Sequence, residues 1–336
     1  MRVGIPREVK KDEGRVSLVP KDVLSLTGRG VEVYVESGAG ASAGFGDGEY
    51  VRSGAHLCEN STELYDTADL IVKVKEPQAS EYGLIRQDQT LFCFFHFQGV
   101  TGLKEAMCAS KATCIAYETM YDDAGYMPVL APMSKIAGEE AVVQGATFLE
   151  TSIHESVVTI IGAGVVGRSA ADTAISMGFQ KVILLDNNIE KLHSLNVAGY
   201  NTAFASPPNI QRSLVLSQLV VGATHSTGNR APVVVTKEML DKLEHRSVLV
   251  DVSIDQGGMT EASRATSITE PTYTYNNTVM FCVPNMLGRV PRRASEQLSA
   301  AILCYVESLA TDGVLAACKK STVLSRGLAI VDGVPV

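Results

Sequence analysis

The chain has 336 residues, and because a domain usually has about 100 to 200 residues, this length predicts two domains. Hydrophobic residues make up 46% of the chain and charged residues 20%, a composition that excludes a disordered or fibrous protein. The 29 Lys and Arg against 37 Asp and Glu give a net charge of −8, so we expect neither a nucleic acid nor a membrane as partner.

No apolar run reaches the roughly 20 residues that span a bilayer, and the N-terminus lacks the apolar core of a signal peptide. The pattern therefore predicts a cytoplasmic protein. The seven cysteines are odd in number and include no C-x-x-C pair, which favours reduced thiols over disulfides or a zinc site. We expect no metal site.

Two series of short apolar runs alternate with helical patterns, as expected of β-α-β units in parallel sheets. The first series comprises residues 2–5, 31–35, 70–74, 91–95 and 114–117, with helices expected over 21–26 and 63–68. A long helix over residues 134–151, with Ser134 as its N-cap, precedes the second series, 157–161, 182–185, 219–222, 248–252 and 279–283. The glycine-rich residues 38–48 are expected to form a loop. A last helix, 294–311, is placed to return the chain to the first domain.

Gly162, Gly164 and Gly167 follow the strand at 157–161 and open a helix expected to end near residue 178. In a G-x-G-x-x-G turn the first glycine makes the turn, the second lets the backbone approach a pyrophosphate, and the third allows close helix packing. Asp186 lies 24 residues after the first glycine, at the end of the next strand, where a carboxylate accepts hydrogen bonds from a ribose and repels a 2′-phosphate. This ordered context predicts binding of NAD rather than NADP.

Polar side chains interrupt several strand ends, where loops carry function in α/β folds. Lys75, His96 and Glu118 each follow an apolar run, Arg15 follows the first strand, and Asp255 follows the strand at 248–252. Taken singly, the three charged residues of the first half have an alternative interpretation as solvated loop charges, His96 as a core imidazole and Asp255 as a turn residue. Their combination favours a catalytic site.

These residues lie in motifs that resemble the alanine dehydrogenase family, which is related to the NAD(H)-binding domain of proton-translocating transhydrogenase. The similar segments span nearly the whole chain, at residues 2–8 (RVGIPRE), 13–16 (EGRV), 70–77 (LIVKVKEP), 116–119 (AYET), 130–134 (LAPMS), 162–167 (GAGVVG), 251–258 (DVSIDQGG) and 282–286 (CVPNM). Pattern and resemblance together imply two Rossmann-like, doubly wound parallel-sheet α/β domains with a cleft between them. The substrate domain would be residues 1–128 plus 291–336, and the NAD(H)-binding domain residues 129–290.

The resemblance implies reversible oxidative deamination of L-alanine to pyruvate and ammonia, with hydride transfer to NAD. Arg15 would bind the substrate carboxylate and Lys75 would polarise the 2-oxo oxygen, with Glu118 also on the substrate side. His96 would be the acid/base group, and Asp255 would assist it or hold the carbinolamine and the nicotinamide ribose. The cofactor site would be completed by the glycine turn, Asp186 and the residues Met133, Ser134, Val165, Val166, Asn285 and Met286.

Several segments depart from the family pattern. A hairpin that contributes to subunit contacts in the family is missing before the strand at 157–161, so the expected homo-oligomer is either a dimer or a hexamer. Leu287 replaces a proline and precedes three arginines that are either solvated or meet an anionic substrate group: Arg289, Arg292 and Arg293. Three alternatives stay open, namely another small 2-amino or 2-oxo acid as substrate, a transhydrogenase-like NAD(H)-binding module, and a non-catalytic NAD sensor.

Overall fold

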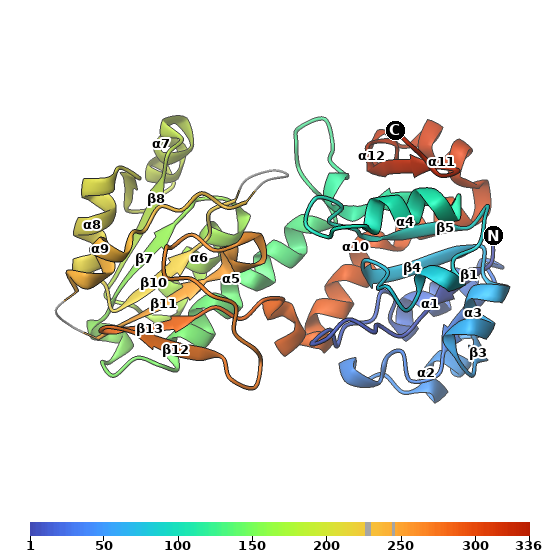
Figure 1. Ribbon diagram of the computed structural model, residues 1–336, viewed down its shortest axis with the longest axis horizontal. Coiled ribbons are helices and arrows are strands. Elements are labelled where there is room, and N and C mark those ends of the chain that lie inside the picture. Colours follow the sequence, from blue (N-terminus) through green and yellow to red (C-terminus); the bar gives the residue numbers. More distant parts are fainter. Residues whose placement is uncertain (226–229, 244–245) are drawn as a thin grey trace. The chain divides into compact units, whose positions relative to one another are not determined.

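The computed structural model describes residues 1–225, 230–243 and 246–336, and the chain forms two compact units (Figure 1). Unit 1 comprises residues 1–133 and 288–336, and unit 2 comprises residues 134–287. The sequence predicts domain boundaries after residues 128 and 290. The separate roles given to the two parts stay a prediction.

Unit 1 is built on an eight-stranded sheet with the order β15-β14-β6-β5-β4-β1-β2-β3. All neighbours among the six strands β1 to β6 pair in parallel, whereas β14 is antiparallel to both β6 and β15. The central strands are buried on both faces, which explains their unbroken apolar runs. The strands are β1 Val3–Ile5, β2 Val33–Glu36, β3 His56–Cys58, β4 Leu70–Lys75, β5 Thr90–Phe94, β6 Thr113–Ala116, β14 Leu328–Val331 and β15 Val334–Pro335.

The helices of unit 1 come from both ends of the chain. The long helix α10 is tied to the N-terminal segment, because Ser295 and Ser299 accept hydrogen bonds from the backbone N–H groups of Val16 and Val19. The helices are α1 Pro20–Thr27, α2 Asp47–Arg52, α3 Ser61–Thr67, α4 Leu103–Ser110, α10 Pro291–Asp312, α11 Val314–Lys320 and α12 Thr322–Gly327, with the short 3₁₀ turns η1 Ala41–Ala43, η2 Tyr82–Leu84 and η3 Tyr117–Thr119.

Unit 2 has a seven-stranded sheet with the order β12-β13-β11-β10-β7-β8-β9, parallel except for the antiparallel strand β12. Its strands are β7 Val157–Ile161, β8 Lys181–Asp186, β9 Thr202–Phe204, β10 Leu219–Gly222, β11 Ser247–Asp251, β12 Thr272–Tyr275 and β13 Thr278–Phe281. Its helices are α5 Leu130–Ala146, which begins in unit 1, α6 Val165–Met177, α7 Ile189–Val197, α8 Pro207–Leu216 and α9 Lys237–Asp241, with 3₁₀ turns η4 Ile153–Glu155, η5 Val252–Gln256 and η6 Met286–Arg289.

Both sheets have a point where the strand order reverses. In unit 1 the chain winds outward from β1 to β3 and then resumes on the other side with β4, β5 and β6; in unit 2, β7 to β9 and then β10 and β11 follow the same course. This confirms the expected doubly wound α/β fold. Ligands of such sheets bind beyond the carboxyl ends of the strands at the reversal, so ligands are expected at the loops that follow β1, β4, β7 and β10.

Two local expectations are wrong. Helix α5 begins at Leu130, so Ser134 lies inside the helix rather than at its N-cap. Pro132 is accommodated because the first backbone N–H groups of a helix have no intrahelical acceptor, and a proline there removes no bond. The segment 38–48 is not entirely loop, since it contains η1 and the start of α2.

Candidate active site

The carboxyl edge of the sheet in unit 1 carries the four candidate residues of that unit. Lys75 is the last residue of β4, His96 lies two residues after β5, Glu118 lies in η3 directly after β6, and Arg15 lies in the loop after β1. Because these strands are parallel, their carboxyl ends meet at one edge. The structure thus places all four at the edge where α/β sheets bind ligands.

Arg15 is buried and held by a neighbour in its own loop. Its backbone N–H and its Nε both donate to Glu13 Oε1, at 2.9 and 2.7 Å, and its Nη2 donates to Glu13 Oε2 at 2.5 Å. Its Nη1 lies 3.6 Å from the Met133 sulfur. Two parallel bonds to one carboxylate fix the plane of the guanidinium, so Glu13 sets the direction in which Arg15 points. Met133, expected near the cofactor, therefore contacts Arg15 within unit 1.

The Glu13–Arg15 pair predicts an acid-sensitive contribution to stability. Burial acts to raise the pKa of Glu13, but the charges of Arg15 and Lys75 and the bonds from Arg15 lower it from 4.5 to about 2. Since the folded pKa is depressed, the contribution is present above about pH 4.5 and is lost as the pH falls through about 2. Urea unfolding should show about 2 kcal/mol of this loss between pH 6 and pH 3, and the Glu13→Gln variant should lack it. An equal loss in the variant would contradict the assignment.

The segment that carries His96 is held by Glu118. Glu118 Oε1 accepts the backbone N–H of His96 at 2.6 Å, and Oε2 accepts that of Phe95 at 3.2 Å. His96 has φ 50°, a left-handed conformation that is uncommon for residues other than glycine and persists where neighbours enforce it. The exposed imidazole stacks on Phe94, with ring centroids 5.9 Å apart. Glu118, expected on the substrate side, thus uses both carboxylate oxygens to hold backbone.

Removal of this carboxylate tests its structural role. In Glu118→Ala the backbone N–H groups of Phe95 and His96 lose their acceptor, so we expect kcat to fall by about 10-fold to 100-fold through misplacement of His96. Glu118→Gln should recover part of the loss, because its amide oxygen still accepts one bond. Steady-state kinetics of both variants check this, and equal losses in the two would argue that Glu118 acts through its charge instead.

The glycine turn of unit 2 fits a dinucleotide. Gly162 has φ 107°, and a Cβ there would lie 2.3 Å from the Ala223 oxygen. A Cβ at Gly167 would lie 1.8 Å from the Gly162 oxygen, whereas a Cβ at Gly164, the N-cap of α6, would meet nothing within 4 Å. The first and third glycines are thus required by packing, and the second leaves open space in front of the helix N-terminus, where backbone N–H groups bind anions.

Asp186 lies at the carboxyl end of β8 with its carboxylate oriented by backbone. It accepts N–H bonds from Ala163 at 2.7 Å and Asn188 at 2.8 Å, and Lys191 Nζ lies 3.1 Å from Oδ2. Burial acts to raise the pKa of Asp186, but these bonds and the Lys191 charge lower it. An ionised carboxylate beside the glycine turn is the acceptor that a ribose diol requires. The chemistry of these residues therefore fits an adenine dinucleotide.

The remaining candidates of unit 2 lie in three environments. Asp255, exposed in η5, is brought to Asn285, whose backbone N–H donates to its Oδ1 at 3.2 Å and whose φ is 54°. Met286 is 4% exposed and belongs to the hydrophobic core, and its expected contact with the cofactor stays a prediction. Ser134 lies in α5, half-buried, and Val165 and Val166 form the first turn of α6.

Sequence reasoning missed the residues that orient the site. Glu13, two residues before Arg15, had a local signal in the E-x-R spacing, but the carboxylate contacts of Glu118 join segments 22 and 23 residues apart and had none. Arg292, one of the arginines left open, stacks on Phe45 with its guanidinium carbon 4.4 Å from the ring centroid and donates to the Gly44 oxygen. That geometry favours a structural role for Arg292.

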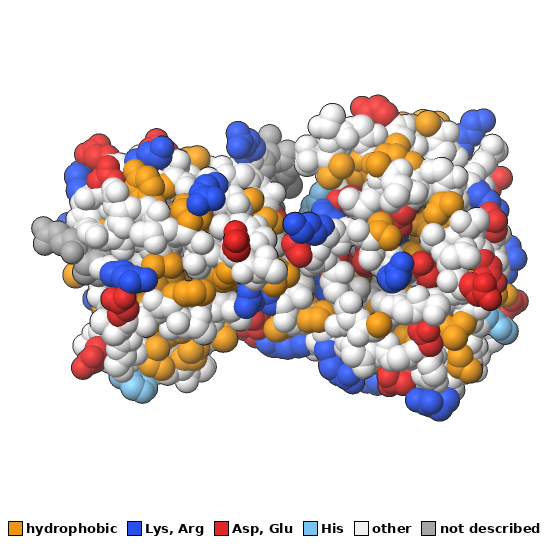
Figure 2. Space-filling view, turned by 60° about the horizontal axis from the view of Figure 1, so that its bottom comes forward, with side chains coloured by type: hydrophobic (Ala, Val, Ile, Leu, Met, Phe, Trp, Pro, Cys, Tyr) orange, Lys and Arg blue, Asp and Glu red, His pale blue; other side chains and the backbone are white. Residues whose placement is uncertain are grey.

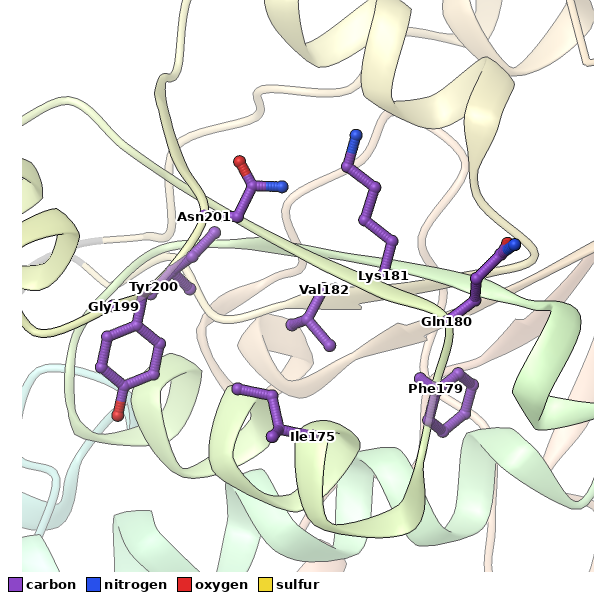
Figure 3. Close-up of a pocket in the computed structure, with 9 residues that line it drawn as sticks. Ile175, Phe179, Gln180, Lys181, Val182, Gly199, Tyr200 and Asn201 are labelled. Atoms are coloured by element: carbon purple, nitrogen blue, oxygen red, sulfur yellow. The ribbon is translucent and has the colours of Figure 1, made fainter.

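Other surface features do not mark a second site. A shallow hollow at the amino end of β8 (Figure 3) contains none of the candidate residues and lies at the sheet edge opposite to the glycine turn; its lining includes Ile175, Phe179, Lys181, Val182, Tyr200 and Asn201. Acidic and basic side chains are interspersed on the face in Figure 2. Among the described residues, no group of three or more His, Cys, Asp or Glu could hold a metal ion, and no described helix has the length and apolarity needed to cross a membrane.

Comparison with known proteins covers the whole chain. The family model of the alanine dehydrogenase/PNT N-terminal domain matches residues 4–137, and that of the C-terminal domain matches residues 137–336. An alanine dehydrogenase of Halomonas elongata is 39% identical, covering 99% of this chain and 94% of the relative. A solved L-alanine dehydrogenase superposes with a TM-score of 0.94 at 36% identity, covering 100% of this chain and 97% of the other. A transhydrogenase from Sinorhizobium meliloti, 24% identical with a TM-score of 0.88 and covering 100% and 99%, shares the fold.

Proposed function

The chain belongs to the alanine dehydrogenase/PNT family, and from this membership and the geometry of both units we propose that it is an NAD-dependent L-alanine dehydrogenase. It catalyses the reversible reaction of L-alanine, NAD⁺ and water to pyruvate, ammonium, NADH and a proton. The observation that carries the proposal is the edge of unit 1, where Arg15 follows β1, Lys75 ends β4 and His96 follows β5 of one sheet.

Each residue of unit 1 has a task suited to its chemistry. Arg15, its fork oriented by Glu13, binds the substrate carboxylate through paired N–H donors. Lys75 places a cation where negative charge develops on the 2-oxo or carbinolamine oxygen. His96 acts as the acid/base group. Asp255, which belongs to unit 2, assists a proton transfer or holds the nicotinamide ribose. Glu118 keeps the His96 backbone in place.

The cofactor would be held by unit 2. Gly162, Gly164 and Gly167 present the N-terminus of α6 to the pyrophosphate, and Asp186 accepts hydrogen bonds from the ribose. When bound, the nicotinamide supplies the hydride acceptor in deamination and the hydride donor in amination. The carboxylate of Asp186 favours NAD over its 2′-phosphorylated form. A homo-oligomer of two or six copies and a cytoplasmic location stay predictions.

The purified protein should oxidise NADH when given both ammonium and a 2-oxo acid. A panel of pyruvate, glyoxylate and oxaloacetate, each with and without ammonium, distinguishes the candidates through the loss of NADH absorbance. The proposal predicts ammonium-dependent oxidation with pyruvate as the best acid. A preference for another acid would identify a different small 2-amino acid as substrate, oxidation without ammonium would indicate hydroxy-acid chemistry, and no oxidation would leave an NAD(H)-binding module.

A further inference from the structure

The carboxyl end of β4, which carries Lys75, lacks regular strand neighbours. On one side β1 pairs with β4 only at Val3–Leu70 and Gly4–Ile71. On the other side the pairing with β5 shifts register between Val72 and Lys75, and Lys75 itself pairs with Phe94. A backbone N–H group that leaves a sheet ladder in a buried region must find another acceptor, and Val74 is buried. The irregular stretch of β4 before Lys75 therefore depends partly on groups from outside the sheet.

Beyond the end of β1, side chains from the segment that follows β1 bind the backbone of β4. Glu8 Oε1 accepts the backbone N–H of Val74 at 2.6 Å, and Glu8 Oε2 accepts that of Lys75 at a longer 3.4 Å. Ser17 Oγ donates to the backbone oxygen of Val72 at 2.6 Å. The Glu8 side chain is only 3% exposed. One carboxylate thus holds the backbone of Lys75 and of the residue before it.

Glu8 is in turn held by a buried ion-pair cluster. Lys73 Nζ lies 3.3 Å from Glu8 Oε2 and 2.8 Å from Glu81 Oε1, and both side chains of Lys73 and Glu81 are almost fully buried. Glu81 also accepts hydrogen bonds from Tyr65 Oη at 3.0 Å and from the backbone N–H of Gln78 at 2.8 Å. These bonds hold Glu81 in place. Glu81 in turn holds the Lys73 ammonium, which lies beside the Glu8 carboxylate.

We propose that Glu8 is a positioning residue for the reaction, which fixes the end of β4 so that the Lys75 ammonium is preorganised for the substrate oxygen. The inference rests on the proposed function, because it assumes that Lys75 acts on a substrate. A fixed cation stabilises developing charge better than a mobile one. A displacement of about 1 Å at such a group costs about 100-fold in rate. Glu8 therefore acts on the rate through Lys75 and does not touch the substrate itself.

The buried charges around Glu8 affect both its ionisation and the stability of the fold. Burial raises the pKa of Glu8 to about 7, with Lys73 lowering it and Glu13 and Glu81 raising it. Since the folded pKa is raised, ionisation of Glu8 lowers the stability of the fold as the pH rises from about 4.5 to about 7. In Glu8→Gln the buried Lys73 keeps its ion pair with Glu81, at 2.8 Å, so no buried charge is left without a partner.

Glu8→Gln and the matched control Glu81→Gln test the proposal. Each variant removes one buried carboxylate beside Lys73. Only Glu8→Gln also removes an acceptor from the backbone of Val74 and Lys75, because one carboxylate oxygen becomes an amide NH2 group, which cannot accept a hydrogen bond. At pH 8 we expect kcat with pyruvate to fall by about 10-fold to 100-fold in Glu8→Gln, with NADH affinity unchanged; thermal melts of both variants show that they are folded at the assay temperature. Glu81→Gln leaves the Glu8 carboxylate and its bonds to the Val74 and Lys75 backbone in place, so it should keep kcat within about threefold. Equal losses in both variants, or a Glu8→Gln kcat within threefold of the native value, would overturn the proposal.

Amide hydrogen exchange gives a readout that needs no substrate. In Glu8→Gln the amide of Lys75 should exchange at least 10-fold faster than in the native protein, while the amides of β5 and of the β1-paired part of β4 keep their rates. Unchanged exchange at Lys75 would show that Glu8 does not hold the strand. If the native protein turns over no oxo acid, the proposed function fails on its own, and the exchange result still decides whether the tether exists.

Discussion

Replacement of His96 by alanine is expected to lower kcat for the reductive amination of pyruvate by about 10²-fold to 10⁴-fold, the range that a positioned general acid–base group contributes. The imidazole is the titratable side chain that follows β5, and its segment is fixed by the bonds from Glu118 to the backbone of Phe95 and His96. NADH affinity should stay within about twofold, because the proposed dinucleotide site lies in unit 2. Steady-state kinetics and fluorescence titration with NADH measure the two effects separately.

A second substitution controls for the unusual backbone at this position. With φ 50°, His96 occupies a region in which Asn, Asp and His are enriched among the residues other than glycine, so His96→Asn keeps the conformation and removes the proton-transferring group. It should lose as much kcat as His96→Ala. Turnover within tenfold of the native rate in His96→Asn would show that the imidazole does not carry the proton, and the acid/base role would pass to another group.

The glycine turn offers the second large effect, in a pair of substitutions of which only one should destabilise the fold. In Gly167→Ala the new Cβ would lie 1.8 Å from the Gly162 oxygen, so the turn must open or α6 must move. We expect a loss of several kcal/mol in the free energy of unfolding, of the size seen for overpacked or strained sites, and a loss of NADH binding. Thermal melts and NADH titration check both.

Gly164→Ala is the matched control. Its Cβ meets nothing within 4 Å, and Gly164 has φ −73°, which alanine adopts readily, so the melting temperature should change little. NADH affinity should nevertheless fall by about 10-fold or more, because the second glycine of the turn is where the backbone approaches the pyrophosphate. Native affinity in Gly164→Ala would mean that the dinucleotide does not bind at this turn.

The parts predictable from the sequence are those whose physical cause is local in the chain. The glycine turn needs residues within six positions of one another, and β7 and β10 have the expected bounds because they are buried, β-branched runs. The end of α6 was predictable from Gly178, whose φ of 88° is the left-handed conformation that glycine adopts at a helix C-terminus.

The parts that escaped prediction depend on contacts between distant segments. The strands β14 and β15 are short, and apart from the buried Ile330 their residues are half-buried or exposed. The place of β14 in the sheet depends on antiparallel pairing with β6, which lies more than 200 residues earlier in the chain. Glu118 was expected to bind substrate because a charged side chain follows an apolar strand there. Its observed contacts are to backbone N–H groups more than 20 residues away. Glu8 likewise depends on a register shift in β4 that no residue pattern indicates.

The most direct test of the account follows the hydrogen that the reaction transfers. With L-alanine carrying deuterium at its α-carbon, the protein and NAD⁺ should form pyruvate and ammonium while the deuterium appears at C4 of the nicotinamide in the NADH produced. Mass spectrometry of the isolated NADH gives the result. Deuterium in NADH with equimolar pyruvate is the outcome that an NAD-dependent alanine dehydrogenase predicts. Pyruvate formed with the label released to solvent, or no NADH at all, would contradict it.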